Sequence, residues 1–478
     1  MKKDRILALN AARNRDIQRI STVNSVMQPT RRLHSGLLVV TLIMICFGLV
    51  MLFSASMSDG YASYAGDSMY YVIKQSGITA IGLVIALIVA ILVPIGLFDH
   101  FWMSLVLYGV TTVLLVYVKF FGILMNGARR WVYIGMRFQP SELAKLALVF
   151  CFASYCSMLK RQRRAGKLRF RTPLRQFIMD GWLDILIPGF AILIWIGLIV
   201  WQPHVSCAII MCFITAVLYL TAGIRIRSWI SGVTQALILV LVLALLVAMI
   251  LPLLPQGNIQ ETIQKNFAHV GDRINTFLNP DEAEEDDTYQ ITQSLIAIGS
   301  GGLSGVGLGE GRQKYNYLPE AHNDFVFAII GEELGFVGTT AVLLLFVIFM
   351  LIGVSITRNA ANSFTALLAG GYTMLISIQA FLNIAVATRT IPSTGISLPF
   401  FSYGGTSNMF FLMAIGFILA VSRSGQRIPR TAGSSPTAET QTEPEPDSRE
   451  WQPELAGYPG SGLDQTAGGI RTGYGDRS

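Results

Sequence analysis

The sequence predicts an all-α integral membrane protein that crosses the bilayer about ten times. Hydrophobic residues make up 52% of the 478 residues and charged residues only 14%, well below the ~25% of a soluble domain. The mean hydropathy is +0.53. Apolar segments of about 18 or more residues recur, and each can cross roughly 30 Å of hydrocarbon. The predicted spans are 36–56, 76–97, 101–119, 141–159, 182–200, 205–222, 230–253, 324–356, 363–386 and 407–423.

The eighth predicted span, 324–356, is too long for one straight crossing, so it should tilt, bend at a glycine or extend past the membrane. A large outer loop of about 255–323 precedes it. Between spans nine and ten, residues 391–408 are rich in Pro and Gly. Because non-helical backbone is tolerated at membrane depth only inside protein or beside a wet cavity, these residues are expected to form a re-entrant or cavity-lining loop.

The basic residues predict which side of the membrane each loop faces. Counting spans places the Lys- and Arg-rich loop 160–175, the loop 223–228 and both chain termini on one side. Loops of this kind face the cytoplasm, so we expect a multi-pass protein of the cytoplasmic membrane with both termini in the cytoplasm. The net charge of +7 reflects this topology and gives no reason to expect nucleic acid as a partner.

Composition divides the chain into three regions. Residues 1–34 form a basic cytoplasmic tail, whose charge favours contact with anionic membrane lipids. Residues 35–425 form the polytopic membrane domain. Residues 426–478 are rich in Pro, Gly, Ser, Thr and Glu and poor in aliphatic residues, which predicts a disordered cytoplasmic tail.

Arg129, Arg130 and Arg137 lie in the predicted outer loop 120–140, although Lys and Arg are generally kept inside. An arginine fork matches two phosphate oxygens at once, so a diphosphate is a natural ligand for them. The alternative is that they hold lipid headgroups or acidic residues of the long outer loop.

Glu142 and Lys145 lie at the start of the fourth span, just after Pro140. Proline and an acid are both favoured in the first turn of a helix. A lone ammonium group within a span is costly, so Lys145 should have a carboxylate partner. Glu142 is available three residues earlier. Glu332 or Glu333 is the alternative, because spans four and eight run in the same direction.

The polar stretch LPEAHND opens the eighth span and contains His322 and Asp324. Asp324 is expected at the outer edge of the bilayer, where it is either a functional carboxylate or the N-cap of the helix. The preceding segment 299–311, GSGGLSGVGLGEG, is too irregular for a dinucleotide-binding loop. Its glycines are expected to permit tight turns and close approach of backbone.

Together, the motifs NGARRW…QPSELAK, GSGGL…LPEAHNDFVFAIIGEELG and TGISLPFFSYGGTS resemble the SEDS family of bacterial membrane proteins, which includes FtsW, RodA and SpoVE, over roughly residues 35–425. The resemblance implies a peptidoglycan glycosyltransferase of cell shape or cell division in the bacterial cytoplasmic membrane. Its substrate would be lipid II, the undecaprenyl-pyrophosphate-linked disaccharide, and its partner a class B penicillin-binding protein. The family's catalytic aspartate falls on Asp324. Its other sensitive polar positions fall on Arg129, Glu142, Lys145 and Ser402.

The sequence departs from the family pattern at two places. The residues QPHVS stand where many members of the family have a motif with an acidic residue. An acid at this position, which His204 occupies here, is therefore not expected to be essential. Arg389 stands where the family often has glycine. This change adds a cation on the outer side, available to a phosphate or to lipid headgroups.

The implied reaction needs a base for the 4-hydroxyl of the acceptor sugar and positive charge beside the departing diphosphate. Asp324 is the expected general base. The substrate-binding candidates are Arg129, Arg130, Lys145, Glu142, His322 and Ser402. The residues expected in supporting structural roles are Glu332, Glu333 and Arg389. No cofactor is certain; a divalent cation, Mg²⁺ or Mn²⁺, near Asp324 is a further expectation, without a ligand cluster in the sequence to support it.

Two alternative functions keep the same site. A lipid II flippase would need a polar path through the middle of the membrane, whereas the informative residues gather on the outer side. A scaffold for the penicillin-binding protein would tolerate loss of the polar outer residues without loss of polymer. We rank the polymerase first.

Overall fold

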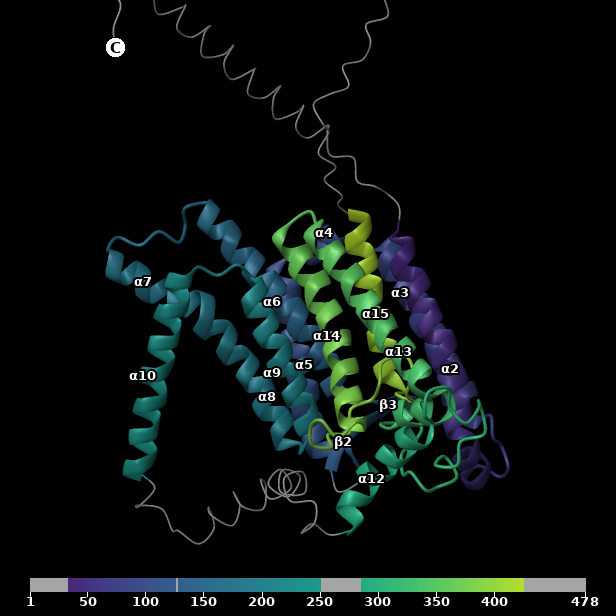
Figure 1. Cartoon of the computed structure of the whole chain (residues 1–478). Coiled ribbons are helices and arrows are strands. Elements are labelled where there is room, and N and C mark those ends of the chain that lie inside the picture. The colour runs from purple at the N-terminus through teal and green to yellow at the C-terminus, as the bar shows by residue number, and fades with distance from the viewer. Residues whose placement is uncertain (1–32, 126–127, 251–284, 425–478) are drawn as a thin grey trace, which may run out of the picture. The chain divides into compact units, whose positions relative to one another are not determined.

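The computed structural model describes residues 33–125, 128–250 and 285–424 (Figure 1). The helices are α2 (Ser35–Ser63), α3 (Tyr70–Leu92), α4 (Ile95–Phe98), α5 (Phe101–Phe121), α6 (Pro140–Arg164), α7 (Pro173–Gly181), the π-helical turn η1 (Trp182–Leu186), α8 (Ile187–Trp201), α9 (Val205–Thr221), α10 (Ile226–Ile250), α12 (Glu285–Ser300), α13 (Val326–Arg358), α14 (Ser363–Ala387) and α15 (Thr406–Ser424). The strands are β1 (Ile123–Met125), β2 (Ala128–Ile134) and β3 (Met136–Phe138).

The prediction of a helical membrane protein with about ten spans is confirmed. Within the described ranges, nine helical segments are long and apolar enough to cross a bilayer, with α7, η1 and α8 counted as one segment. The remaining predicted span is α9, whose 17 residues fall at the short end of the usual range of about 17–25. The predicted tails and residues 251–284 of the large outer loop lie outside the described residues, apart from residues 33 and 34.

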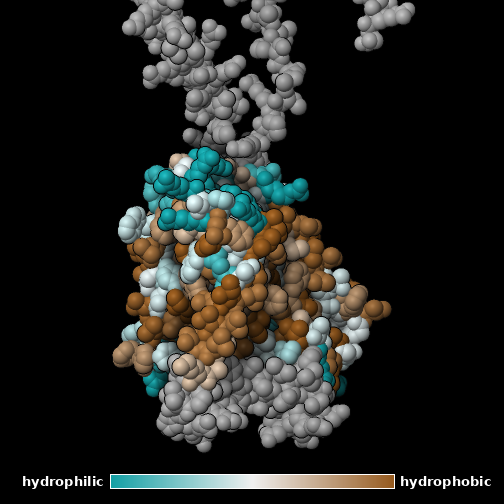
Figure 2. All heavy atoms as spheres, turned by 90° about the vertical axis from the view of Figure 1, so that its left-hand side faces the viewer, coloured by the Kyte–Doolittle hydropathy of each residue, from teal (hydrophilic) through white to brown (hydrophobic). Residues whose placement is uncertain are grey.

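Helices α6, α14 and α15 form the centre of the bundle, whereas α10 is largely exposed along its length. The central helices pack closely where they carry small residues: a Cβ added to Gly371 of α14 would lie 2.4 Å from Val149 of α6. Small residues are common at such contacts because they let helix backbones approach. Figure 2, which faces the α10 side, shows a broad band of hydrophobic residues with hydrophilic residues gathered at the upper end.

The described chain also contains a small antiparallel sheet, which the all-helical prediction did not include. Its strands run in the order β1-β2-β3 between α5 and α6. Val132 of β2 pairs with Phe138 of β3, and Leu124 of β1 pairs with Arg129 of β2. The sheet covers the end of the bundle opposite to the start of α2 and the end of α15 (Figure 1).

Helix α13 bends at Gly335, where φ is 63° and ψ is −157°. Of the three alternatives given for this long span, the structure shows the bend at a glycine. The bend deprives Phe336 and Val337 of their helical acceptors, and their amides donate instead to Gly302 O (2.9 Å) and Leu303 O (3.2 Å). The freed carbonyls of residues 332 and 333 accept from the amides of residues 306 and 307, both at 3.0 Å. Helix and loop therefore exchange backbone hydrogen bonds.

This exchange explains the glycines of segment 299–311. A Cβ on Gly301 would lie 1.9 Å from Gly331 O, and a Cβ on Gly305 would lie 2.1 Å from Glu333 O. Gly305 also has a φ of +80°, a region that residues with a side chain rarely adopt. The prediction that these glycines allow tight turns and close backbone approach is confirmed.

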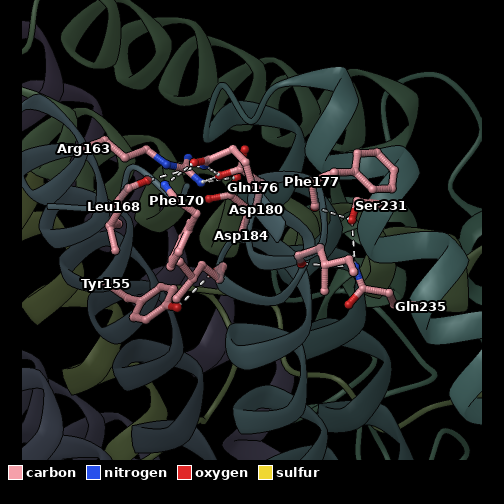
Figure 3. Close-up of polar contacts among 12 residues, drawn as sticks. Tyr155, Arg163, Leu168, Phe170, Gln176, Phe177, Asp180, Asp184, Ser231 and Gln235 are labelled. Carbon is pink, nitrogen blue, oxygen red and sulfur yellow. Dashed lines mark hydrogen bonds and ion pairs between the residues drawn. The ribbon is translucent and has the colours of Figure 1, made fainter. Parts of the chain in front are cut away.

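A polar network joins α6, α7, η1 and α10 at the other end of the bundle (Figure 3). Arg163 forms ion pairs with Asp180 at 2.8 Å and with Asp184 at 2.9 Å. Ser231 of α10 donates to Phe177 O of α7 at 2.6 Å. Since much of α10 is exposed, these contacts hold its first half against α7 and η1.

Candidate active site

Asp324 lies two residues before α13, half-buried beside the loop between α14 and α15. Asn383 of α14 donates to Asp324 O at 2.7 Å and to Ile396 O of the loop at 2.6 Å. Gly395 is so close that a Cβ there would lie 3.3 Å from Asp324 Oδ2. The N-cap residue of α13 is Phe325, and Asp324 lies one residue before it.

The loop from residue 388 to 405 is non-helical, as its Pro and Gly content predicts. It packs tightly into the bundle, because a Cβ on Gly48 of α2 would lie 2.2 Å from Phe400 O. Ser402 is only 2% exposed, and its Oγ accepts the Leu398 amide at 2.8 Å. In this structure Ser402 shapes the loop that lies beside Asp324.

Lys145 is buried and its ammonium group has two partners, Glu142 Oε1 at 2.8 Å and Gln379 Oε1 at 2.7 Å. The prediction that Lys145 has a carboxylate partner is confirmed, and of the three candidates the partner is Glu142. Gln379 in turn donates to Ser397 O at 3.3 Å. The Glu142–Lys145 pair is thereby connected to the loop beside Asp324.

Glu332 and Glu333 do not pair with Lys145, so that alternative is wrong. Glu332 accepts the amides of Arg312 at 2.7 Å and of Gln313 at 3.3 Å. Glu333 forms an ion pair with Lys314 at 2.7 Å, and neither side chain is exposed. Both glutamates therefore anchor the loop that precedes α13. The sequence did not predict Lys314 as the partner of Glu333.

The outer arginines contact backbone carbonyls at the ends of nearby helices. Arg129 is exposed and donates to Phe120 O of α5 at 2.7 Å. Arg130 donates to Gln202 O at 3.3 Å and to Pro203 O. Arg389 lies just after α14 with a φ of +54°. The sheet and the α8–α9 connection thus place Arg129 and Arg130 on one flank of the bundle end.

His322 faces a different flank, formed by α2 and α3. Its ring centroid lies 4.5 Å from that of Tyr71, and its Nε2 lies 4.0 Å from Asp59 Oδ2. Burial lowers the pKa of His322, while the nearby Glu320 and Asp59 oppose this effect. A lowered pKa keeps the imidazole neutral at pH 7, so it can both donate and accept a hydrogen bond.

Three residues that build this site were not predicted from the sequence: Asn383, Gln379 and Lys314. Two of them carried a signal, since Gln379 and Asn383 are polar, lie four residues apart on one face of α14, and interrupt an apolar span. Polar residues inside a span are costly and mark contacts with other polar groups. Lys314 carried no comparable pattern.

A model of the FtsW/RodA/SpoVE family, described as "Cell cycle protein", matches residues 35–427. The chain belongs to this family. It is 35% identical over 386 residues to "Probable peptidoglycan glycosyltransferase FtsW" of Geobacter sp. (strain M18), a match that covers 80% of this chain and 95% of the relative. It is 34% identical over 393 residues to "Stage V sporulation protein E" of Bacillus subtilis (strain 168), covering 81% and 96%.

Solved structures agree with the FtsW/RodA/SpoVE assignment. A chain from a structure described as "Structural coordination of polymerization and crosslinking by a peptidoglycan synthase complex" matches with a TM-score of 0.57 and 26% identity, covering 82% of this chain and 98% of that one. The rod shape determining protein RodA of Thermus thermophilus matches with a TM-score of 0.53 and 24% identity, covering 82% and 97%. At this lower identity, the match to RodA supports the fold and not a shared activity.

Proposed function

We propose that this protein polymerises lipid II into glycan strands at the outer face of the cytoplasmic membrane, with Asp324 as general base. The protein is a peptidoglycan glycosyltransferase, as its family and its relatives at 32–35% identity indicate. The placement of Asp324 carries the finer proposal. Its backbone is fixed by Asn383, and its carboxylate lies against the loop beside it.

In this mechanism Asp324 accepts the proton of the acceptor's 4-hydroxyl as the oxygen attacks the anomeric carbon of the donor. The glycosidic bond forms while the bond to the lipid diphosphate breaks, and the diphosphate leaves with the electron pair. Arg129 and Arg130 supply positive charge on the outer side for this leaving group. One base and direct displacement invert the anomeric centre.

The deep ionisable groups favour polymerisation over transport. Lys145 pairs with Glu142 and Lys314 pairs with Glu333, and all four side chains are almost fully buried. A flippase needs polar groups that are accessible to its cargo at the middle of the membrane. Here these charges neutralise one another and hold loops in place.

The described residues contain no group of three or more His, Cys, Asp or Glu placed to hold a metal ion. Asp324 alone could give a divalent cation one carboxylate ligand. The other oxygens would come from the substrate's diphosphate and water, as Mg²⁺ commonly accepts. Bound in this way, the cation would add to the charge that stabilises the leaving group.

We propose a class B penicillin-binding protein as the partner, supported by the match to a chain of a peptidoglycan synthase complex. We further propose that both termini are cytoplasmic. In a variant without the native cysteines, a cysteine at Asp67 should react with an impermeant thiol reagent added to intact cells, whereas one at Ala165 should not. Labelling of position 165 alone would reverse the orientation.

The decisive experiment compares Asp324→Asn with the parental protein in a lipid II polymerisation assay, with the cognate penicillin-binding protein present. The amide cannot accept the proton, so polymer formation should fall by the ~10²–10⁴-fold of a lost general base, without a change in unfolding temperature. Glu310→Gln removes an exposed carboxylate of the preceding loop and should retain full activity. An Asp324→Asn enzyme with the parental rate would end the assignment.

A further inference from the structure

Four tyrosines gather beside His322, and the proposed reaction does not use them. Tyr64 closes α2, Tyr70 and Tyr71 open α3, and Tyr403 lies in the loop before α15. We call these four residues the tyrosine platform. Tyr64 and Tyr70 are stacked, with ring centroids 3.5 Å apart and planes at 15°.

Tyr71 is the centre of this platform. Its ring meets Tyr64, Tyr70 and Tyr403 edge-on, at centroid distances of 5.6, 5.4 and 4.8 Å. It is only 8% exposed, and its hydroxyl donates to Asp59. Tyr64 is 38% exposed, and Tyr70 and Tyr403 are half-buried. A buried ring thus fixes three others that keep accessible surface.

The platform is continuous with the candidate active site. The Tyr403 amide donates to His322 O at 2.9 Å, and the His322 ring lies against Tyr71. His322 is two residues from Asp324. A ligand that rests on the platform would therefore extend toward the proposed general base.

The platform has hydrogen-bonding groups at its edge that can hold the hydroxyl groups of a sugar. Asp59 offers carboxylate oxygens, which repel phosphate but accept hydrogen bonds from hydroxyl groups. The Lys74 ammonium lies over the Tyr70 ring, 4.0 Å from its centroid, and donates to the Tyr70 hydroxyl. The C–H groups on one face of a pyranose carry partial positive charge, which is complementary to the negative face of an aromatic ring.

Tyrosines at the ends of membrane helices commonly anchor them in the headgroup region. An anchor needs only one ring with its hydroxyl in water. Here the rings contact one another, and the central hydroxyl is engaged by a carboxylate from another helix. This arrangement holds the rings in fixed positions relative to one another.

We propose that the tyrosine platform is a saccharide subsite, which binds the uncharged sugar rings of the glycan beside Asp324. This inference rests on the proposed function, because it assigns a part of the same substrate. The diphosphate would lie on the flank of Arg129 and Arg130, and the sugars would lie against the face of Tyr64 that Tyr70 does not cover.

The test uses the full chain in nanodiscs and the N-acetylglucosamine tetramer, an uncharged probe without lipid or diphosphate. Binding is measured by calorimetry. Tyr64→Leu removes the ring face that receives the sugar, and Tyr70→Leu removes the ring stacked against Tyr64. Each substitution should weaken binding about threefold to tenfold. Tyr64→Phe keeps the face and should bind like the parental protein. Tyr133→Leu, at a tyrosine of β2 that is 67% exposed, should have no effect.

Each outcome decides one of the two proposals. An active polymerase that does not bind the tetramer, or that binds equally well after Tyr64→Leu and Tyr70→Leu, overturns the subsite and leaves the function standing. An equal loss in Tyr133→Leu also overturns it, since binding is then unspecific. Tetramer binding that depends on the platform, in a protein that makes no polymer, supports the subsite and overturns the function. Thermal unfolding of each variant confirms that it is folded, and Tyr64→Phe remains informative if a leucine variant is not.

Discussion

Replacing Lys314 by methionine should destabilise the protein strongly, because a carboxylate would remain buried without its cation. The Lys314 ammonium donates to Glu333 Oε1 at 2.7 Å, to Gly309 O at 2.6 Å and to Ser54 Oγ at 3.1 Å. All three of its hydrogens are therefore used. Removing one partner of a buried ion pair costs about 3–5 kcal/mol. We expect Lys314→Met to lower the free energy of unfolding by this amount.

A second substitution separates the ion pair from simple packing. Glu333→Gln in the Lys314→Met background removes the uncompensated charge, and the new amide can still accept the Ser54 hydroxyl. The double variant should therefore be more stable than Lys314→Met. The interaction energy between the two side chains, which also requires Glu333→Gln alone, should be about 0.5–3 kcal/mol, as for other residues in contact. The same substitution in the parental protein completes the double-mutant cycle.

The assay is reversible unfolding in mixed micelles, followed by circular dichroism as the denaturing detergent increases. Lys167→Met is the control, because Lys167 is exposed in the loop after α6. Its effect should stay within about 0.5 kcal/mol. If Lys314→Met behaves like this control, Glu333 is solvated and the buried pair does not hold the loop.

Three further predictions use the same unfolding assay. Gly305→Ala should lower the free energy of unfolding by at least about 1 kcal/mol more than Gly309→Ala does. Both glycines have a positive φ, but only a Cβ at residue 305 would meet a carbonyl oxygen, at 2.1 Å. Equal losses of stability in the two variants would contradict the described packing. Because the pKa of His322 is lowered from 6.5, its contribution to stability is complete above about pH 6.5 and is lost as the pH falls through the lowered pKa. His322→Gln should therefore flatten the decline in stability from about pH 8 to about pH 5, and an unchanged slope would refute this origin. Gln379→Leu should cost about 1–3 kcal/mol, because Lys145 loses a neutral acceptor; a silent substitution would show that this contact is not needed.

Local patterns predicted the parts of the molecule that depend on nearby residues. The apolar segments predicted the spans because length and hydropathy suffice for a helix to cross a bilayer. The Glu142–Lys145 pair was predictable, since residues three apart on a helix are neighbours. The length of the eighth span showed that a straight crossing was not possible, but it left a tilt, a bend at a glycine and an extension past the membrane as alternatives.

Contacts between distant segments could not be predicted in this way. Lys314 and Glu333 are 19 residues apart, and only the folded loop turns the lysine toward α13. Asn383 reaches Asp324 across 59 residues. The strands β1 and β3 have three residues each, too few to show an alternating pattern. Which side chains meet Asp324 was therefore set by tertiary packing.

The exchange of hydrogen bonds at Gly335 makes the loop and the helix one cooperative unit. A straight helix satisfies its own backbone, whereas the outer turns of α13 need residues 302–307 to do so. Neither segment can open alone without leaving amides or carbonyls unpaired. The amide hydrogens of Val306, Gly307, Phe336 and Val337 should therefore exchange with deuterium at a common rate, although two lie in a loop and two in a membrane helix.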